Sequence, residues 1–120
     1  MSKAAISVFV FSIYLYLLGL ILVAFPNVLL SLFRLPQTNE VWIRVVGMLV
    51  LILGYYFTTA ARNELTSFLR ASVIARLTVP VFFVVFVLLD FAPPILILFG
   101  VIDAAAATWT GLALRAHNPT

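Results

Sequence analysis

Apolar residues fill four long stretches of the chain, and shorter polar stretches separate them. Each stretch is close to the roughly 20 residues that an α-helix needs to cross a bilayer. The pattern predicts an all-α polytopic membrane protein, an antiparallel bundle of four transmembrane helices in a single domain over residues 1–120. The predicted spans are about residues 4–25, 40–61, 70–90 and 94–114.

The connection between the first two spans has an apolar pattern of its own. Pro26 ends the first span, and the segment 27–34 is too short to cross a membrane although it contains several leucines. A short apolar segment that ends in a basic residue, here Arg34, is typical of a helix lying at the membrane surface. We therefore expect a short interfacial helix between the first and second spans.

The second span carries one face of small and polar residues. At about 100° per residue, a stripe roughly 100° wide collects several positions of this span. These positions are Arg44, Gly47, Leu51, Gly54, Tyr55, Thr58 and Arg62. A membrane helix with such a face has a neighbouring helix or a ligand to contact, so we expect this face to form one wall of a site.

The third span is set apart by the position of its charges. In the third span, the longest uncharged run lies between Arg76 and Asp90, and this run by itself is too short for a full span. Extension toward residue 70 reaches membrane length and places Arg76 inside the helix, where its charge would face protein rather than lipid. Pro80 removes one backbone hydrogen bond, so we expect a kinked span.

Composition excludes several classes of protein. The chain is 65% hydrophobic and 9% charged, whereas a soluble domain has about 25% charged residues. The net charge of +3 comes from basic residues that are scattered at segment ends. They form no basic patch, so the sequence does not indicate a nucleic-acid-binding protein. The absence of cysteine excludes disulfides and thiolate metal ligands. Because no nucleophile constellation, metal-ligand set or phosphate-binding loop is evident, we expect no catalytic residue, no metal and no cofactor.

The basic residues predict an orientation in the membrane. Four spans place both termini on the same side, and Arg34 and Arg44 on the other. By the positive-inside rule, the termini are expected in the cytoplasm. The basic residues on the terminal side are Lys3, Arg62, Arg70, Arg76 and Arg115.

The charges inside the spans are the candidate functional residues. A charged side chain at the centre of a membrane helix costs roughly 2.5–3.5 kcal/mol on insertion scales, so such charges need partners. Asp103 lies near the middle of the fourth span. An extended arginine side chain at position 44 or 76 would reach the depth of Asp103 in the membrane. Arg44, Arg76, Asp103, Tyr55 and Tyr56 are therefore predicted to be ligand-binding residues of a polar pocket. The alternative is that an Asp103–arginine pair only fastens the helices together.

Small residues in the second and fourth spans have a spacing that lets helices approach closely. Gly100 with Ala104, and Ala107 with Gly111, form small-xxx-small pairs in the fourth span. The full set of predicted helix-packing residues is Gly47, Gly54, Gly100, Ala104, Ala107 and Gly111.

Several of these positions carry a resemblance to a known family. They are Arg44, Gly47, Leu53 to Tyr56 (Leu-Gly-Tyr-Tyr), Arg76 and Asp103. Together with the architecture, they resemble small bacterial four-helix membrane proteins of the broad DoxX-like group, over most of the chain. The namesake of that group is similar to an accessory subunit of quinol-linked oxidoreductase systems, so the resemblance implies a helper or quinone-proximal role. The resemblance also implies that the membrane is the bacterial inner membrane.

Three functions remain open from the sequence. The favoured one is an integral membrane binding or accessory protein whose polar pocket holds a lipid-like, quinone-like or anionic small molecule. The second is a small proton-coupled transporter or channel, in which Asp103 would couple to protons and Arg76 to an anion. The third is an enzyme acting on a lipid or quinone, with Asp103 as acid and base. The expected partners are membrane lipid and the small molecule, with a homo-oligomer or larger membrane complex left open.

Overall fold

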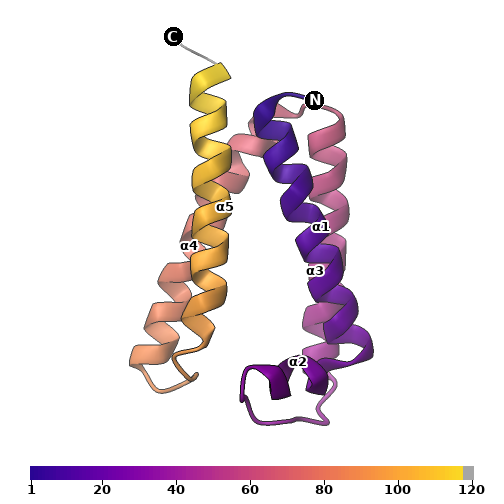
Figure 1. Cartoon of the computed structure of the whole chain (residues 1–120), viewed down its shortest axis with the longest axis vertical. Coiled ribbons are helices and arrows are strands. Elements are labelled where there is room, and N and C mark those ends of the chain that lie inside the picture. Colours follow the sequence, from indigo (N-terminus) through magenta and orange to yellow (C-terminus); the bar gives the residue numbers. More distant parts are fainter. Residues whose placement is uncertain (118–120) are drawn as a thin grey trace. The chain divides into compact units, whose positions relative to one another are not determined.

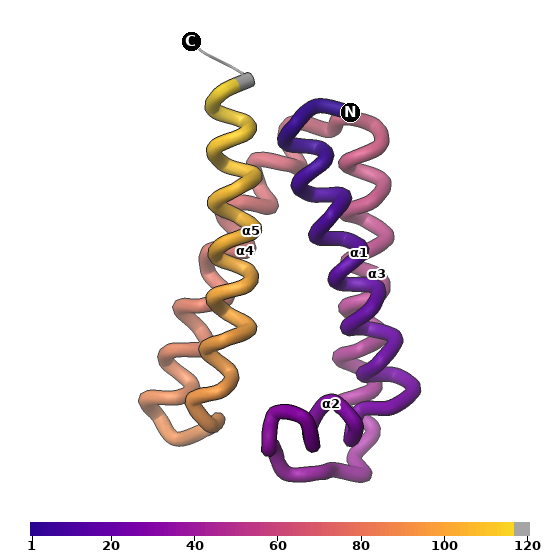
Figure 2. Tube along the Cα trace, in the orientation of Figure 1, coloured from indigo at the N-terminus to yellow at the C-terminus, as the bar shows by residue number. Residues whose placement is uncertain are grey.

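The chain is helical through most of the part that the structure describes, residues 1–117. The computed structural model has no strand in these residues, and Figures 1 and 2 show the path of the chain. The helices in order are α1 (Lys3–Ala24), α2 (Pro26–Leu32), α3 (Trp42–Arg62), α4 (Thr66–Leu88) and α5 (Leu96–His117).

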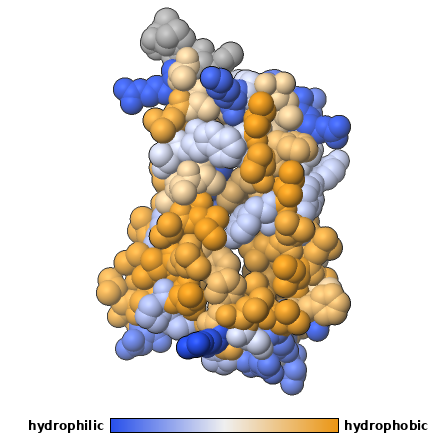
Figure 3. All heavy atoms as spheres, in the orientation of Figure 1, coloured by the Kyte–Doolittle hydropathy of each residue, from blue (hydrophilic) through white to orange (hydrophobic). Residues whose placement is uncertain are grey.

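Four of these helices are long and apolar enough to cross a membrane. They are α1, α3, α4 and the part of α5 from Leu96 to Ala116. On the face drawn in Figure 3, apolar side chains cover the middle of the helices and hydrophilic side chains gather toward their ends. The prediction of an all-α, multi-pass membrane protein is therefore confirmed. The seven-residue helix α2 begins at Pro26, in the segment where a short helix was expected.

Helices α3, α4 and α5 begin at other residues than the sequence pattern predicted, and α3 begins at Trp42 instead of residue 40. Helix α4 starts four residues before the expected residue 70, because the carbonyl oxygen of Leu65 already accepts a hydrogen bond from the Leu69 N–H at 3.0 Å. Helix α5 starts at Leu96, because the carbonyl oxygens of Pro93 and Pro94 first make tighter, three-residue turns. Pro80 lies inside α4, and the kink there stays a prediction.

Three charged residues end helices in the left-handed backbone conformation. Arg34, Glu64 and Asp90 follow α2, α3 and α4 with φ of 56°, 51° and 61°. In each case the N–H of the next residue donates to a carbonyl five positions earlier; after α4, Phe91 donates to Phe86 at 2.8 Å. This is the Schellman helix end, where glycine is the usual residue. A charged residue there lacks glycine's freedom but keeps the helix end polar.

The chain divides into two compact units, which we describe separately. One unit contains Met1–Val8 and the chain from Ala60 onward, and the other is Phe9–Thr59. Helices α1 and α3 contribute residues to both. The division does not test the expectation of a single domain.

In the unit Phe9–Thr59, α1 and α3 pack together as antiparallel neighbours. Contacts run from Tyr16 against Gly54 to Val23 against Gly47, so positions rise along one helix as they fall along the other. A Cβ built on Gly47 would lie 2.9 Å from the backbone nitrogen of Val23. No side chain fits at that distance, and glycine at position 47 therefore allows the two backbones to approach.

In the other unit, α4 and α5 pack as an antiparallel pair, visible side by side in Figure 1. Gly100 lies against Pro80, where a built Cβ would come within 2.9 Å of the proline Cα. Gly111 lies against Val73 at an ordinary contact distance of 3.6 Å. The pair is therefore closest at the end where α5 begins, next to the proline of α4.

Candidate functional site

The candidate site is a group of polar side chains around Arg76, in the middle of α4. Only 3% of this residue is exposed. Its Nε donates to the carbonyl oxygen of Ser72 at 3.2 Å, and its Nη2 donates to Ser72 Oγ at 3.1 Å. Ser72 lies one helical turn earlier, and helical side chains lean toward the N-terminus, so this spacing brings the two groups together.

Thr110 of α5 and Ser7 of α1 extend the group to two further helices. Arg76 Nη2 donates to Thr110 Oγ1 at 3.0 Å, and Thr110 Oγ1 lies 2.6 Å from Ser7 Oγ. Both hydroxyl residues are buried. We call Arg76, Ser7, Ser72 and Thr110 the Arg76 cluster. It joins residues that are 103 positions apart in the sequence.

The protons of the two hydroxyls limit which of these hydrogen bonds can form at the same time. Ser7 Oγ also lies 2.7 Å from the Ala4 carbonyl oxygen, and Thr110 Oγ1 lies 3.2 Å from the Ala106 carbonyl oxygen. Each hydroxyl has one proton, so the two cannot serve all three contacts at once. The shortest set runs from Arg76 to Thr110, from Thr110 to Ser7, and from Ser7 to Ala4. The arginine charge is thus dispersed along aligned hydroxyl dipoles.

Asp103 of α5 supplies the opposite charge. It is half-buried and interacts electrostatically with Arg76. At 1.5 Å per residue, Asp103 lies about 10 Å from the start of α5, and Arg76 lies about 18 Å from the facing end of α4. Among the residues that the structure describes, none donates a hydrogen bond to the Asp103 carboxylate. The carboxylate is therefore available to a donor from outside the described chain.

The energetics of the Arg76 cluster follow from its place inside a membrane-spanning helix. A charged arginine at such a depth costs roughly 2.5–3.5 kcal/mol on insertion scales. Hydrogen bonds to charged groups contribute about 1.5–3 kcal/mol each, although the values measured between membrane helices are lower. The bonds to Ser72 and Thr110 and the attraction of Asp103 therefore offset much of the burial of Arg76.

Arg44, a predicted ligand-binding residue, contacts the end of another helix. Its Nη1 donates a hydrogen bond to the carbonyl oxygen of Val23, in the last turn of α1. The last carbonyl groups of a helix have no partner within the helix, and a positive charge there is favourable. Arg44 therefore caps α1, while its side chain stays exposed.

Tyr55 and Tyr56, also predicted ligand-binding residues, are both exposed. Their exposed fractions are 64% and 55%, and their ring centroids lie 6.5 Å apart. On α3 it is Gly54 and Thr58 that face α1; Thr58 Oγ1 donates to Tyr16 Oη at 3.2 Å. Arg44, Tyr55 and Tyr56 belong to the unit Phe9–Thr59, so their part in a site with Arg76 and Asp103 stays a prediction.

The predicted helix-packing residues differ in how closely they pack. Gly47, Gly54 and Gly100 each lie where a built Cβ would be 3.2 Å or less from a neighbour. Ala107 is fully buried, and Ala104 is half-buried. Gly111 has room for a methyl group.

The main residues that the sequence analysis left out of the site are the hydroxyls. Ser72 and Thr110 already shared helix faces with Arg76 and Asp103 respectively, because of their four- and seven-residue spacings. Ser7 had one weaker signal, a run of small residues with Ala4 and Ala5 in an otherwise bulky span. In the described part of the chain, no three acidic, histidine or cysteine side chains lie together as a metal site would require.

Comparison with protein-family models, curated proteins and solved structures gave no match. The resemblance to the DoxX-like group therefore stays a prediction that rests on the residues named above.

Proposed function

We propose that this chain is an integral membrane binding or accessory protein that holds a lipid-like or anionic small molecule between its spans. The observation that carries the proposal is Asp103, which accepts no hydrogen bond from the described residues and lies within electrostatic range of the buried charge of Arg76. Polar and ionisable groups inside a membrane are costly, and they are most often kept for a function.

The two charges favour a ligand with both kinds of hydrogen-bonding group. Asp103 would accept a hydrogen bond from a hydroxyl, while the positive potential of Arg76 favours a nearby oxygen that carries a full or partial negative charge. A quinol ring or the polar end of a lipid has both groups attached to an apolar body. This chemistry also suits the helper or quinone-proximal role that the DoxX-like resemblance implies.

Native mass spectrometry of the protein in mild detergent, with a short-chain benzoquinol as the probe, tests the proposal. The wild type is expected to form an adduct, and Asp103→Asn to weaken it roughly tenfold, since the ligand hydroxyl then donates to a neutral amide oxygen instead of a charged carboxylate. Asp90→Asn is the matched control, because Asp90 lies outside α4 and α5 and is exposed. Equal binding by the wild type and Asp103→Asn, or no adduct with the wild type, would argue against the proposal.

A small proton-coupled transporter is the alternative that the same carboxylate favours. A half-buried acidic group without a donor is a place where a proton can bind within a span. Proton flux into liposomes, followed with a pH-sensitive dye, would then stop in Asp103→Asn and persist in Asp90→Asn. Liposomes that show no flux with the wild type would leave the binding function as the better proposal.

We further propose that both termini face the cytoplasm, in a bacterial inner membrane. Lys3, Arg62, Arg70 and Arg115 lie at the helix ends on the terminal side, and Arg34 and Arg44 on the other. A fluorescent protein fused to the C-terminus is expected to fluoresce, and alkaline phosphatase fused there to stay inactive. The reverse result would overturn this orientation.

A further inference from the structure

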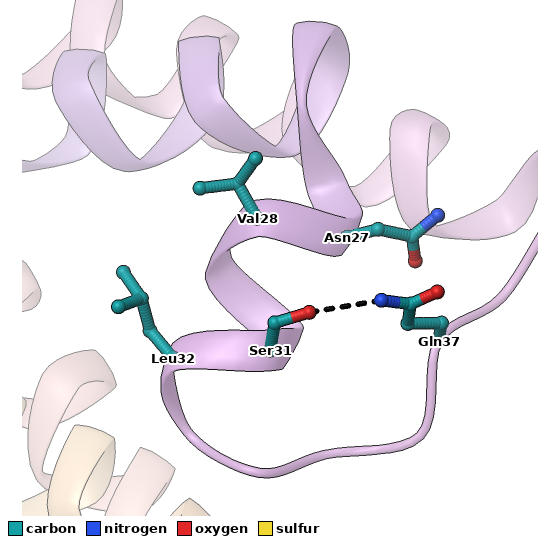
Figure 4. Close-up of a pocket in the computed structure, with 5 residues that line it drawn as sticks. All are labelled: Asn27, Val28, Ser31, Leu32 and Gln37. Atoms are coloured by element: carbon teal, nitrogen blue, oxygen red, sulfur yellow. Dashed lines mark hydrogen bonds between the residues drawn. The ribbon is translucent and has the colours of Figure 1, made fainter.

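A second site lies beside α2, well separated in the sequence from Arg76 and Asp103. A cavity of about 450 Å³ is lined by Asn27, Val28, Ser31, Leu32 and Gln37. It is an open hollow on the surface rather than an enclosed cavity, with a volume in the range of small-molecule sites. Figure 4 shows these side chains, with Gln37 reaching back from the following loop toward Ser31. All five residues belong to the unit Phe9–Thr59.

The lining has a polar side and an apolar side. Asn27 and Ser31 are four residues apart on α2 and form one row, and Val28 and Leu32 form the adjacent row. The apolar row is exposed, with 57% of Val28 and 73% of Leu32 accessible. A ligand that matches both rows has a polar end joined to an apolar chain.

The polar side has mainly hydrogen-bond donors left over. Asn27 Oδ1 already accepts the Thr38 N–H at 2.9 Å, so the two protons of the Asn27 Nδ2 group remain as donors. Ser31 Oγ accepts from Gln37 Nε2 at 2.9 Å, so Ser31 retains its own proton, and Gln37 retains a second N–H together with its acceptor Oε1. No acidic side chain lines the cavity. Its ligand therefore presents oxygen acceptors.

The surroundings identify the class of ligand. Helix α2 connects two membrane-spanning helices, and a short helix with exposed apolar residues at that place lies at the level of the lipid headgroups. Arg34, two residues beyond Leu32, is exposed and adds positive charge to the segment. The phosphate and ester oxygens of phospholipids are acceptors without donors, attached to acyl chains.

We infer that this cavity binds a membrane glycerophospholipid. The Asn27, Ser31 and Gln37 donors hold the phosphodiester, and an acyl chain follows Val28 and Leu32. This site is independent of the proposed function of Arg76 and Asp103, so either can fail without the other.

Asn27→Asp is the sharpest test. The carboxylate keeps an acceptor for the Thr38 N–H, so the loop retains its contact, but the donors are replaced by a negative charge that repels phosphate. Asn39→Asp is the matched control, because it adds the same charge to an exposed loop position outside the lining. Gln37→Glu makes the same test from the loop and can still accept a bond from Ser31.

Binding is measured by native mass spectrometry of the whole protein in detergent, with three probes. We expect dioleoylphosphatidylglycerol to bind at least roughly tenfold more tightly than dioleoylglycerol or inorganic phosphate, as expected when charged hydrogen bonds and acyl contact both contribute. Asn27→Asp and Gln37→Glu are expected to weaken phospholipid binding roughly tenfold, and Asn39→Asp to leave it within about twofold. Equal losses in Asn27→Asp and Asn39→Asp would overturn the inference. So would equally tight binding of dioleoylglycerol, which lacks phosphate, or of free phosphate, which lacks acyl chains.

Discussion

Replacing Thr110 by valine tests the Arg76 cluster most directly. Valine has nearly the shape of threonine, but it cannot accept the 3.0 Å hydrogen bond from Arg76 or make the 2.6 Å contact with Ser7. Thr110 is fully buried, so water cannot replace the lost partner without opening the helices. The substitution therefore leaves part of a buried charge without its bond.

The expected magnitude follows from the two bonds that are lost. A hydrogen bond to a charged group contributes about 1.5–3 kcal/mol, and a neutral bond between membrane helices averages about 0.6 kcal/mol. Asp103 still attracts the guanidinium in the variant, and the unfolded chain can place arginine at the membrane surface. We therefore expect Thr110→Val to lower the free energy of unfolding by about 2 kcal/mol.

The assay is equilibrium unfolding in mixed detergent micelles with sodium dodecyl sulfate as denaturant, followed by the fluorescence of Trp42 and Trp109. The matched control is Thr108→Val, because Thr108 is exposed and its hydroxyl donates only within α5, to the Ala104 carbonyl oxygen. Thr108→Val should change the free energy of unfolding by less than about 0.5 kcal/mol. If Ser7 and Thr110 act together, Ser7→Ala should lower the free energy of unfolding less in the Thr110→Val variant than in the wild type. Equal stability of Thr110→Val and Thr108→Val would refute the reasoning.

Three further predictions use the same unfolding assay or hydrogen exchange. Gly100→Ala is expected to destabilise the α4–α5 pair by about 1–3 kcal/mol, because its Cβ would meet the Pro80 backbone. Gly111→Ala, which has room beside Val73, should be neutral or stabilising. Equal effects of the two substitutions would contradict the packing described. Asp90→Gly is expected to raise the free energy of unfolding by up to about 1 kcal/mol, since glycine adopts a φ of 61° without strain; a loss would show that the Asp90 side chain contributes more than its backbone costs. Glu64→Gln is expected to speed hydrogen exchange in the first turn of α1, because the Ser2 N–H and hydroxyl both donate to the Glu64 carboxylate. Glu40→Gln is the control. Unchanged exchange in Glu64→Gln would refute a role of Glu64 in stabilising the start of α1.

Much of the fold could be predicted from the pattern of apolar residues. In lipid every backbone polar group needs an internal partner, so a long apolar run has to be a helix, and its length fixes whether it spans. This is why the four spans and the short helix after Pro26 were predicted correctly as elements. Their starts were less accurate, because local bonds such as Leu69 to the Leu65 carbonyl lie next to polar residues, here 62–64, where hydropathy has no sharp edge.

The polar residues of the site could be predicted only in part. Helical spacing indicated that Arg76 lies inside a span, because this depends on the residues of one helix alone. Spacing does not give the rotation of one helix relative to another. For that reason neither the cap that Arg44 makes on α1 nor the exposure of Tyr55 followed from the stripe on α3.

The sequence by itself determined that this protein is a chain of membrane-spanning helices with charges inside three of them, because transfer into lipid is a property of each residue and its neighbours. The tertiary structure decided which groups those charges meet. Ser7 and Thr110 come together only when residues far apart in the chain pack side by side, and a hydrogen bond of 2.6 Å depends on distances that no spacing along one helix contains.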